Sequence, residues 1–98
     1  MNMQQIMAQA QKMQRDIMSK KEKLDAMSFE GKSEWVTVKF NGKKEITELE
    51  ITCDDAFEKE NKEILTDMLI LAIKDAMNKI DKETENQMGE YSKMGGLF

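Results

Sequence analysis

The sequence contains no histidine, no proline and a single cysteine, and only 6% of its 98 residues are aromatic. Without histidine, the chain lacks the most common general base and the most common metal ligand of proteins. The one thiol, at Cys53, has no histidine partner that could activate it as a nucleophile, and we expect it to serve as a small buried hydrophobic residue. The sequence therefore predicts a protein that is not an enzyme and that uses no metal, cofactor or small-molecule substrate.

Long apolar segments are also missing. No stretch of about 18 apolar residues could span a membrane, and the first residues lack the pattern of a cleavable signal. A single cysteine cannot form an intrachain disulfide, which agrees with a reducing compartment. We therefore expect a cytoplasmic protein that has no membrane partner.

Charge is plentiful but unevenly distributed along the chain. The net charge is −4, yet residues 1–27 carry five basic and three acidic side chains, whereas residues 54–90 carry five basic and eleven acidic ones. An acidic protein is an unusual partner for nucleic acid, because phosphates attract basic surfaces. Any DNA-binding function has to be reconciled with this net charge.

Residues 1–27 show the periodicity of a long amphipathic helix. Apolar residues recur at steps of three and four, with one charged interruption at Lys20. At ~1.5 Å per residue such a helix would be roughly 40 Å long, which is more than the rest of so short a chain can cover. We therefore expect its apolar seam to contact a partner. The seam consists of Met3, Ile6, Ala10, Met13, Ile17, Lys20, Leu24 and Met27.

Residues 28–53 change to the alternating pattern of a half-buried antiparallel sheet, with a short edge strand near its start. Asn41-Gly42 is a strong signal for a two-residue hairpin turn, because both residues accept positive φ. Such a turn would place Phe40 opposite Lys43. One face of the hairpin would then carry Val36, Val38, Phe40, Leu49 and Ile51.

Residues 54–90 predict a second helix, whose apolar stripe is wide enough to be covered from two directions. The stripe ends at Ile80, so we expect the following residues to extend the helix without packing, and residues 91–98 to form a loose tail. The whole chain, residues 1–98, is predicted to be one α+β domain with the order helix, three-stranded antiparallel sheet, helix.

Helices that overhang a small sheet leave apolar surface exposed, and a homodimer is the economical way to cover it. Both helices contribute residues to the expected interface. These are Met3, Ile6, Ala10, Met13, Ile17, Met68, Leu71 and Ala72.

Basic residues recur along the first helix at steps that allow a phosphate-facing stripe, and further lysines follow in the second helix. The competing interpretation is a solvated surface that nearby carboxylates neutralise. A dimer favours the first interpretation, because two copies of a modest stripe at a fixed separation can follow one duplex. The candidate DNA-binding residues are Lys12, Arg15, Lys20, Lys23, Lys74, Lys79 and Lys82.

Several short motifs resemble those of the YbaB/EbfC family of bacterial nucleoid-associated proteins. Residues 8–14 (AQAQKMQ) resemble an AQxMQ segment in its first helix, and the Asn41-Gly42 hairpin followed by residues 49–51 (LEI) is similar to its strand pair. Three further stretches are also similar to the family: 65–69 (LTDML), 72–76 (AIKDA) and the 94–98 tail (MGGLF). Lys74 stands where the family often has asparagine, and Asp55 replaces a common proline.

The resemblance implies an intertwined homodimer whose helices protrude like tweezers, and it implies binding of duplex DNA at the nucleoid. Our first hypothesis is a non-enzymatic, dimeric DNA-binding protein that grips phosphates with weak sequence preference and thereby affects gene expression. The alternative is a small acidic interaction module or chaperone-like dimer, whose methionine-rich seam holds the helix of a partner protein. A gel-shift titration at low salt distinguishes the two.

Overall fold

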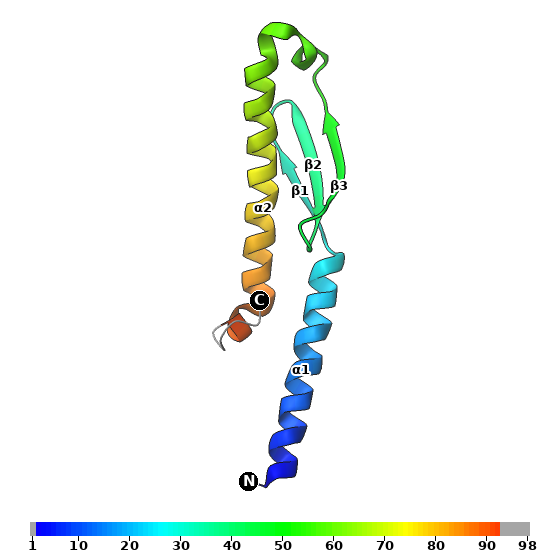
Figure 1. Ribbon diagram of the computed structural model, residues 1–98, viewed down its shortest axis with the longest axis vertical. Helices are drawn as coiled ribbons and strands as arrows, with labels where there is room; N and C mark the ends of the chain where they lie inside the picture. Colours follow the sequence, from blue (N-terminus) through cyan, green and yellow to red (C-terminus); the bar gives the residue numbers. More distant parts are fainter. Residues whose placement is uncertain (1, 93–98) are drawn as a thin grey trace.

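Helical spacing of apolar residues at both ends of the chain, and alternation in its middle, produce two helices joined by a small sheet. The computed structural model describes residues 2–92. It confirms the predicted element order and the antiparallel sheet (Figure 1). The elements are α1 (Met3–Ala26), β1 (Ser28–Lys32), β2 (Val36–Asn41), β3 (Ile46–Ile51), the 3-10 turns η1 (Asp54–Phe57) and η2 (Lys59–Asn61), and α2 (Lys62–Ser92).

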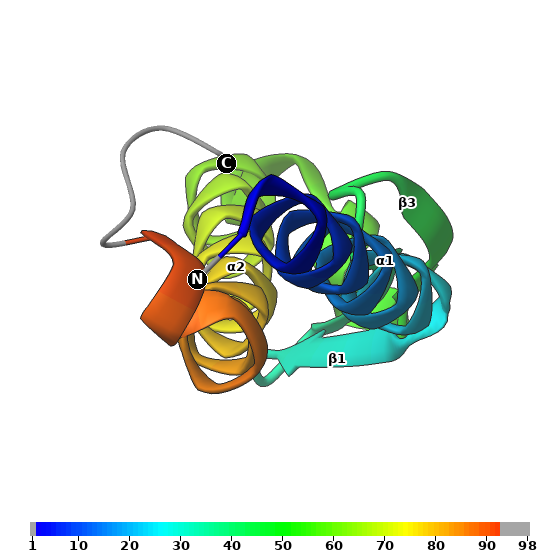
Figure 2. The same cartoon turned by 90° about the horizontal axis from the view of Figure 1, so that it is seen from below.

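The molecule is elongated, with extents of 70 × 20 × 14 Å. The start of α1 lies at one end and the η1–η2 turn at the other, so the two helices overlap only along part of their lengths (Figure 1). The Asn2 side chain begins α1 by accepting a hydrogen bond from the Gln5 backbone N–H at 2.9 Å. Viewed from below, α1 runs beside α2 (Figure 2).

The core lies between the sheet and α2. Val36, Val38 and Phe40 of the central strand are almost completely buried against α2, together with Ala76 and Ile80. Strand order is β1-β2-β3, and α2 packs mainly against β1 and β2. β3 is therefore the uncovered edge of the sheet.

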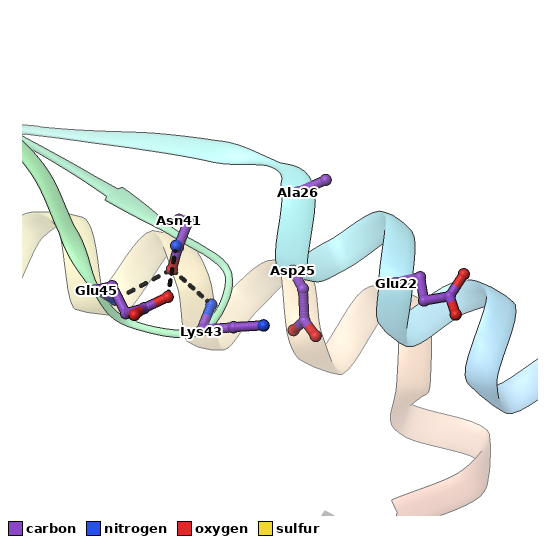
Figure 3. A pocket seen from close by; sticks show the side chains of 6 residues that line it. All are labelled: Glu22, Asp25, Ala26, Asn41, Lys43 and Glu45. Carbon is purple, nitrogen blue, oxygen red and sulfur yellow. Dashed lines mark hydrogen bonds between the residues drawn. The ribbon is translucent and has the colours of Figure 1, made fainter.

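The β2–β3 hairpin forms where predicted, but the predicted two-residue turn is wrong. Phe40 pairs with Ile46 rather than Lys43, and the register shifts between Lys39 and Phe40. The connection is a longer loop, in which the Asn41 side chain accepts the backbone N–H groups of Lys43 and Glu45 at 2.9 and 3.1 Å (Figure 3). An asparagine that bonds its own loop in this way favours a wider turn.

The shifted register still leaves Leu49 and Ile51 opposite Val38 and Val36, on the face that was predicted. They are not buried as their neighbours are, because α2 does not reach β3: Leu49 is 44% exposed and Ile51 half-buried. Cys53 is likewise only half-buried. This face of β3 is open apolar surface.

The second helix begins at Lys62 rather than at residue 54, because two 3-10 turns occupy residues 54–61. The packed part of α2 also extends beyond Ile80, where the predicted apolar stripe ends. Met88 is only 1% exposed and belongs to the core, where the end of α1 closes over it. Tyr91 and Ser92 continue the helix, and the rest of the predicted tail lies outside the described residues.

Candidate nucleic-acid interface

Three of the predicted cations form one row along α1. At 100° per residue, Lys12, Arg15 and Lys23 lie within about 80° of one another and opposite the stripe that contains Ile17 and Leu24. All three are exposed, whereas Ile17 and Leu24 pack into the core. Among residues 2–92 no ion pair or hydrogen bond engages these three side chains. We call Lys12, Arg15 and Lys23 the outer row.

Two members of the outer row, Lys12 and Arg15, stand on a projecting arm. Every residue from 2 to 16 is exposed, because the sheet and α2 reach only the C-terminal half of α1 (Figure 1). We call residues 2–16 the arm. It contains two cations and a single carboxylate, at Asp16. A rigid helix that extends from the body can enter a groove or lie along a strand of phosphates.

One concentration of negative charge lies at the other end of the molecule. Residues 54–67 carry six acidic and two basic side chains and form the η1–η2 turn and the start of α2. This turn and the arm lie at opposite ends of a molecule 70 Å long (Figure 1). The Debye length is only about 8 Å at physiological ionic strength, so the acidic end has little influence on the arm.

Lys20 does not belong to the outer row. It is half-buried and lies on the helical wheel beside the apolar stripe, close to the position of Met13. It also has an interaction of its own with the rest of the chain. We therefore leave Lys20 out of the proposed DNA contacts.

Lys79, another predicted DNA contact, has a role within the protomer. Its ammonium donates to the backbone carbonyl of Glu30 at 2.7 Å and lies 3.4 Å from the Asp75 carboxylate. That carboxylate in turn accepts the Lys32 backbone N–H at 3.1 Å. The outer edge of β1 is thus fastened to α2 by a clamp made of Asp75 and Lys79.

The clamp makes stability depend on pH. The pKa of Asp75 lies below its ordinary value of 3.8 because the carboxylate accepts the Lys32 backbone N–H and lies beside the Lys79 ammonium. A depressed folded-state pKa adds stability above the unfolded-state pKa, and this stability is lost as the pH falls through the folded-state pKa. In urea unfolding between pH 3 and 7, we expect Asp75→Asn to be less stable than the natural chain at neutral pH, with the difference shrinking below about pH 4. A difference that stays constant over this range would contradict the clamp.

The remaining predicted cations, Lys74 and Lys82, are exposed on α2. Thr84 and Met88 face α1, and Lys82 lies at least 100° around the helix from both. One protomer therefore does not bring Lys82 into the outer row.

The predicted dimer residues also divide into exposed side chains and side chains that pack within their own chain. Met3, Ile6 and Met13 are exposed by 75%, 49% and 38%, and Ala10 between them is exposed as well. Ile17 and Met68 are half-buried against the core of their own chain, and Leu71 is 54% exposed.

Ala72 was predicted to lie in the interface, and this is wrong, because it is fully buried under β1 of the same chain. Ile46 of β3, which the sequence pattern placed on the outer face of the hairpin, is exposed. Sequence patterns missed the exposure of Leu49 on β3, and of Phe57 and Ile64 near the turn. Their exposure follows from which strands α2 covers, and no local signal in the sequence encodes that.

Other chemistry has little support in the described part of the chain. Residues 2–92 contain no cluster of three or more potential metal-binding side chains. A cavity of about 320 Å³ beside Asp25 and Lys43 is lined mainly by charged and polar side chains (Figure 3). No helix among residues 2–92 is both long and apolar enough to span a membrane.

Comparisons with known proteins agree on one group. Residues 1–96 match the family described as the YbaB/EbfC DNA-binding family. The chain is 39% identical over 95 residues to a nucleoid-associated protein of Ligilactobacillus salivarius, covering 95% of this chain and 90% of the relative. A nucleoid-associated protein of Streptococcus equi subsp. zooepidemicus is 42% identical over 95 residues, covering 94% of each chain.

A solved structure has the same fold. The crystal structure of an uncharacterized protein from Helicobacter pylori superimposes with a TM-score of 0.76 and 25% sequence identity. The match covers 97% of this chain and 99% of the other.

Proposed function

The chain belongs to the YbaB/EbfC DNA-binding family, and we propose that it acts as a homodimer that grips the phosphates of duplex DNA with the outer row of α1. It is a nucleoid-associated DNA-binding protein rather than an enzyme. We place it at the nucleoid within the cytoplasm, with an effect on gene expression that follows from occupying DNA.

The observation that carries the phosphate-gripping mechanism is the outer row itself. Lys12, Arg15 and Lys23 are exposed, share one face and have no internal ion-pair partner among residues 2–92. From Lys12 to Lys23 the row extends ~16 Å along the helix axis, about the rise of five base pairs along one strand. Cations held in this way release counterions from DNA when they bind, which supplies affinity without reading sequence.

Weak sequence preference follows from the composition of the arm. Its polar residues are mainly glutamines on a helix whose cations suit phosphate oxygens, and phosphate contacts carry no sequence information directly. Lys74 and Lys82 of α2 stay candidates for further phosphate contacts in the dimer.

The protomer leaves part of the apolar stripe of α1 exposed, and this bare stripe is the reason for proposing a dimer. The apolar stripe of α1 is covered from Ile17 to Leu24 by its own chain, while Met3, Ile6 and Met13 continue the same stripe in the open. Leu49 of β3 and Leu71 of α2 are further exposed apolar side chains. Soluble monomers rarely expose large apolar patches, and a second copy would bury the bare stripe while holding two outer rows at a fixed separation.

Light scattering tests the dimer directly. We expect a mass of twice 11.4 kDa at micromolar concentration, and Ile6→Asp, which places a charge in the bare stripe, to shift the protein towards a monomer. Gln9→Asp introduces the same charge on the polar side of the arm and is the matched control. A natural chain that scatters as a monomer would overturn the dimer.

The alternative function is supported by the exposed methionines of α1. Met3, Met7 and Met18 are exposed by 75%, 58% and 63%, and flexible methionine surfaces suit the capture of varied apolar helices. A gel-shift titration with a random-sequence duplex decides between the two proposals. Retarded DNA at low salt supports phosphate gripping, whereas a folded dimer that gives no shift at low salt favours the protein-binding alternative.

A further inference from the structure

From the contacts around Gly42, we infer that the β2–β3 loop, residues 41–45, is the positioning element that aims the arm, and that Gly42 sets the arm's direction. This inference rests on the proposed function, because a fixed arm direction matters only if the outer row binds a ligand of fixed spacing. The loop itself touches no proposed DNA contact. It acts through the last turn of α1.

The first step is the contact between Gly42 and α1. A Cβ atom at residue 42 would lie 1.9 Å from the carbonyl oxygen of Leu24 and 2.9 Å from the Cα of Asp25. Both neighbours are backbone atoms, which cannot rotate away as a side chain can. The Gly42 backbone N–H also donates to the Asp25 carbonyl oxygen at 3.2 Å. Glycine is required here because two backbones meet, and the contact binds a carbonyl that the helix end would otherwise leave without a partner.

The second step is the rigidity of the loop. Asn41 holds it closed with three side-chain hydrogen bonds, two to backbone N–H groups and one from its own amide nitrogen to the Glu45 carboxylate at 2.9 Å (Figure 3). Lys44 completes the turn with a left-handed φ of 68°. Its ammonium reaches Asp81 of α2 at 3.6 Å, so the loop is fastened to both helices. Figure 3 shows the loop against the end of α1, with Asp25 next to Lys43.

The third step is the length of α1 between the Gly42 contact and the arm. Leu24 is the only fully buried residue of α1, and every residue from 2 to 16 is exposed, so contacts near residue 24 orient the whole arm. Lys12 lies ~18 Å from Leu24 along the axis, and a tilt of about 10° would displace it by ~3 Å. Successive phosphates of one strand are about 3.4 Å apart along the duplex axis. A small change at Gly42 therefore moves Lys12 by about one phosphate spacing. Lys23, next to Leu24, stays almost in place, so the row no longer matches the same phosphates.

The test compares Gly42→Ala with Gly89→Ala. A Cβ at residue 89 meets only the flexible side chain of Glu85, so this control makes the same chemical change without a backbone collision. Spin labels at Gln9→Cys and Asn86→Cys, in a Cys53→Ser background, report the distance between the arm and α2. Labelled protein is diluted with excess unlabelled protein, so that both spins lie on one chain.

We expect Gly42→Ala to keep its helix content but to shift the distance by several ångströms. It should weaken duplex binding about tenfold or more and reduce the slope of log K against log salt by about one to two, because fewer phosphates are engaged. If Gly42→Ala only lowered stability, a smaller fraction of the protein would bind DNA, but the slope of log K against log salt would not change. A folded Gly42→Ala with an unchanged distance, or with a shifted distance and unchanged affinity and slope, overturns the inference.

A second variant covers the case in which Gly42→Ala does not fold. Asn41→Ala removes the three side-chain hydrogen bonds without filling the contact, and we expect a broader distance distribution with weaker binding. An unchanged distribution in Asn41→Ala overturns the inference. If the natural chain fails to bind duplex DNA while Gly42→Ala still shifts the distance, the proposed function fails and the positioning role of Gly42 stands.

Discussion

Reversing the charges of Lys12 and Arg15 is expected to weaken duplex binding by at least about 100-fold at ~0.1 M salt. Each phosphate contact contributes roughly 0.9 to the slope of log K against log salt, and a dimer loses four contacts in the double variant. Both side chains are exposed and carry no internal hydrogen bond or ion pair among residues 2–92, so the variant Lys12→Glu, Arg15→Glu should fold and assemble as the natural chain does. Fluorescence anisotropy of a labelled random-sequence duplex measures the loss.

The matched control for the charge reversal lies at the acidic end. Lys59→Glu with Lys62→Glu changes the net charge by the same amount at exposed positions near the η1–η2 turn. We expect it to alter affinity by less than about threefold, because the turn lies many Debye lengths from the arm. Equal effects of the two double variants would show that net charge, rather than the outer row, governs binding.

Replacing Gly31 by alanine is expected to have the largest effect on stability, with a loss of about 3 kcal/mol or more in the free energy of unfolding. A Cβ at residue 31 would lie 2.0 Å from the carbonyl oxygen of Ala72 and 2.7 Å from the backbone nitrogen of Ala76. The collision is between backbones, so β1 must move away from α2 and open the core. The accompanying fall in melting temperature should exceed about 10 °C for a chain of this size.

Gly89→Ala again provides the control, because we do not expect it to lower the free energy of unfolding. Residue 89 lies in α2, and an added Cβ would come nearest to the flexible side chain of Glu85, so alanine should be neutral or stabilise by up to about 1 kcal/mol. Thermal and urea unfolding followed by circular dichroism measure both variants. A Gly31→Ala chain as stable as the natural one would contradict the close packing of β1 on α2.

The element order could be predicted from the sequence because it rests on local periodicity. The steps of three and four in residues 3–24, and the alternation from Val36 to Phe40, each fix an element without reference to the rest of the chain. The basic face of α1 could be predicted only in part: Lys12, Arg15 and Lys23 share a face by helical spacing, whereas Lys20, predicted with them, is half-buried beside the apolar stripe.

The parts that could not be predicted depend on long-range contacts. The hairpin register was wrong because the Asn41 side chain bonds within a longer loop, and because Gly42 of that loop meets Leu24 of α1, a contact that a local turn preference cannot report. Lys79 looked like a DNA contact because its bond to the Glu30 carbonyl joins residues 49 positions apart. Ala72 looked like interface for a similar reason, since only the close approach of Gly31 buries it.

The acidic net charge no longer opposes a DNA-binding role once the charges are placed in space. Six carboxylates lie in residues 54–67, around the η1–η2 turn, while the exposed arm contains Asp16 as its single acidic residue. The turn and the arm lie at opposite ends of the molecule (Figure 1). The affinity of a site depends on the charges within about a Debye length of the phosphates. A chain with a net charge of −4 can therefore carry a basic site at one end.

The central claim is that the outer row binds phosphates, and the salt dependence of duplex binding tests it most directly. The measurement is the affinity of the natural dimer for a random-sequence duplex at four or five salt concentrations, beside the Lys12→Glu, Arg15→Glu variant. We predict a steep linear fall of log K with log salt for the natural chain and a slope smaller by about three to four for the variant. A flat salt dependence, or equal slopes for the two proteins, would contradict the claim.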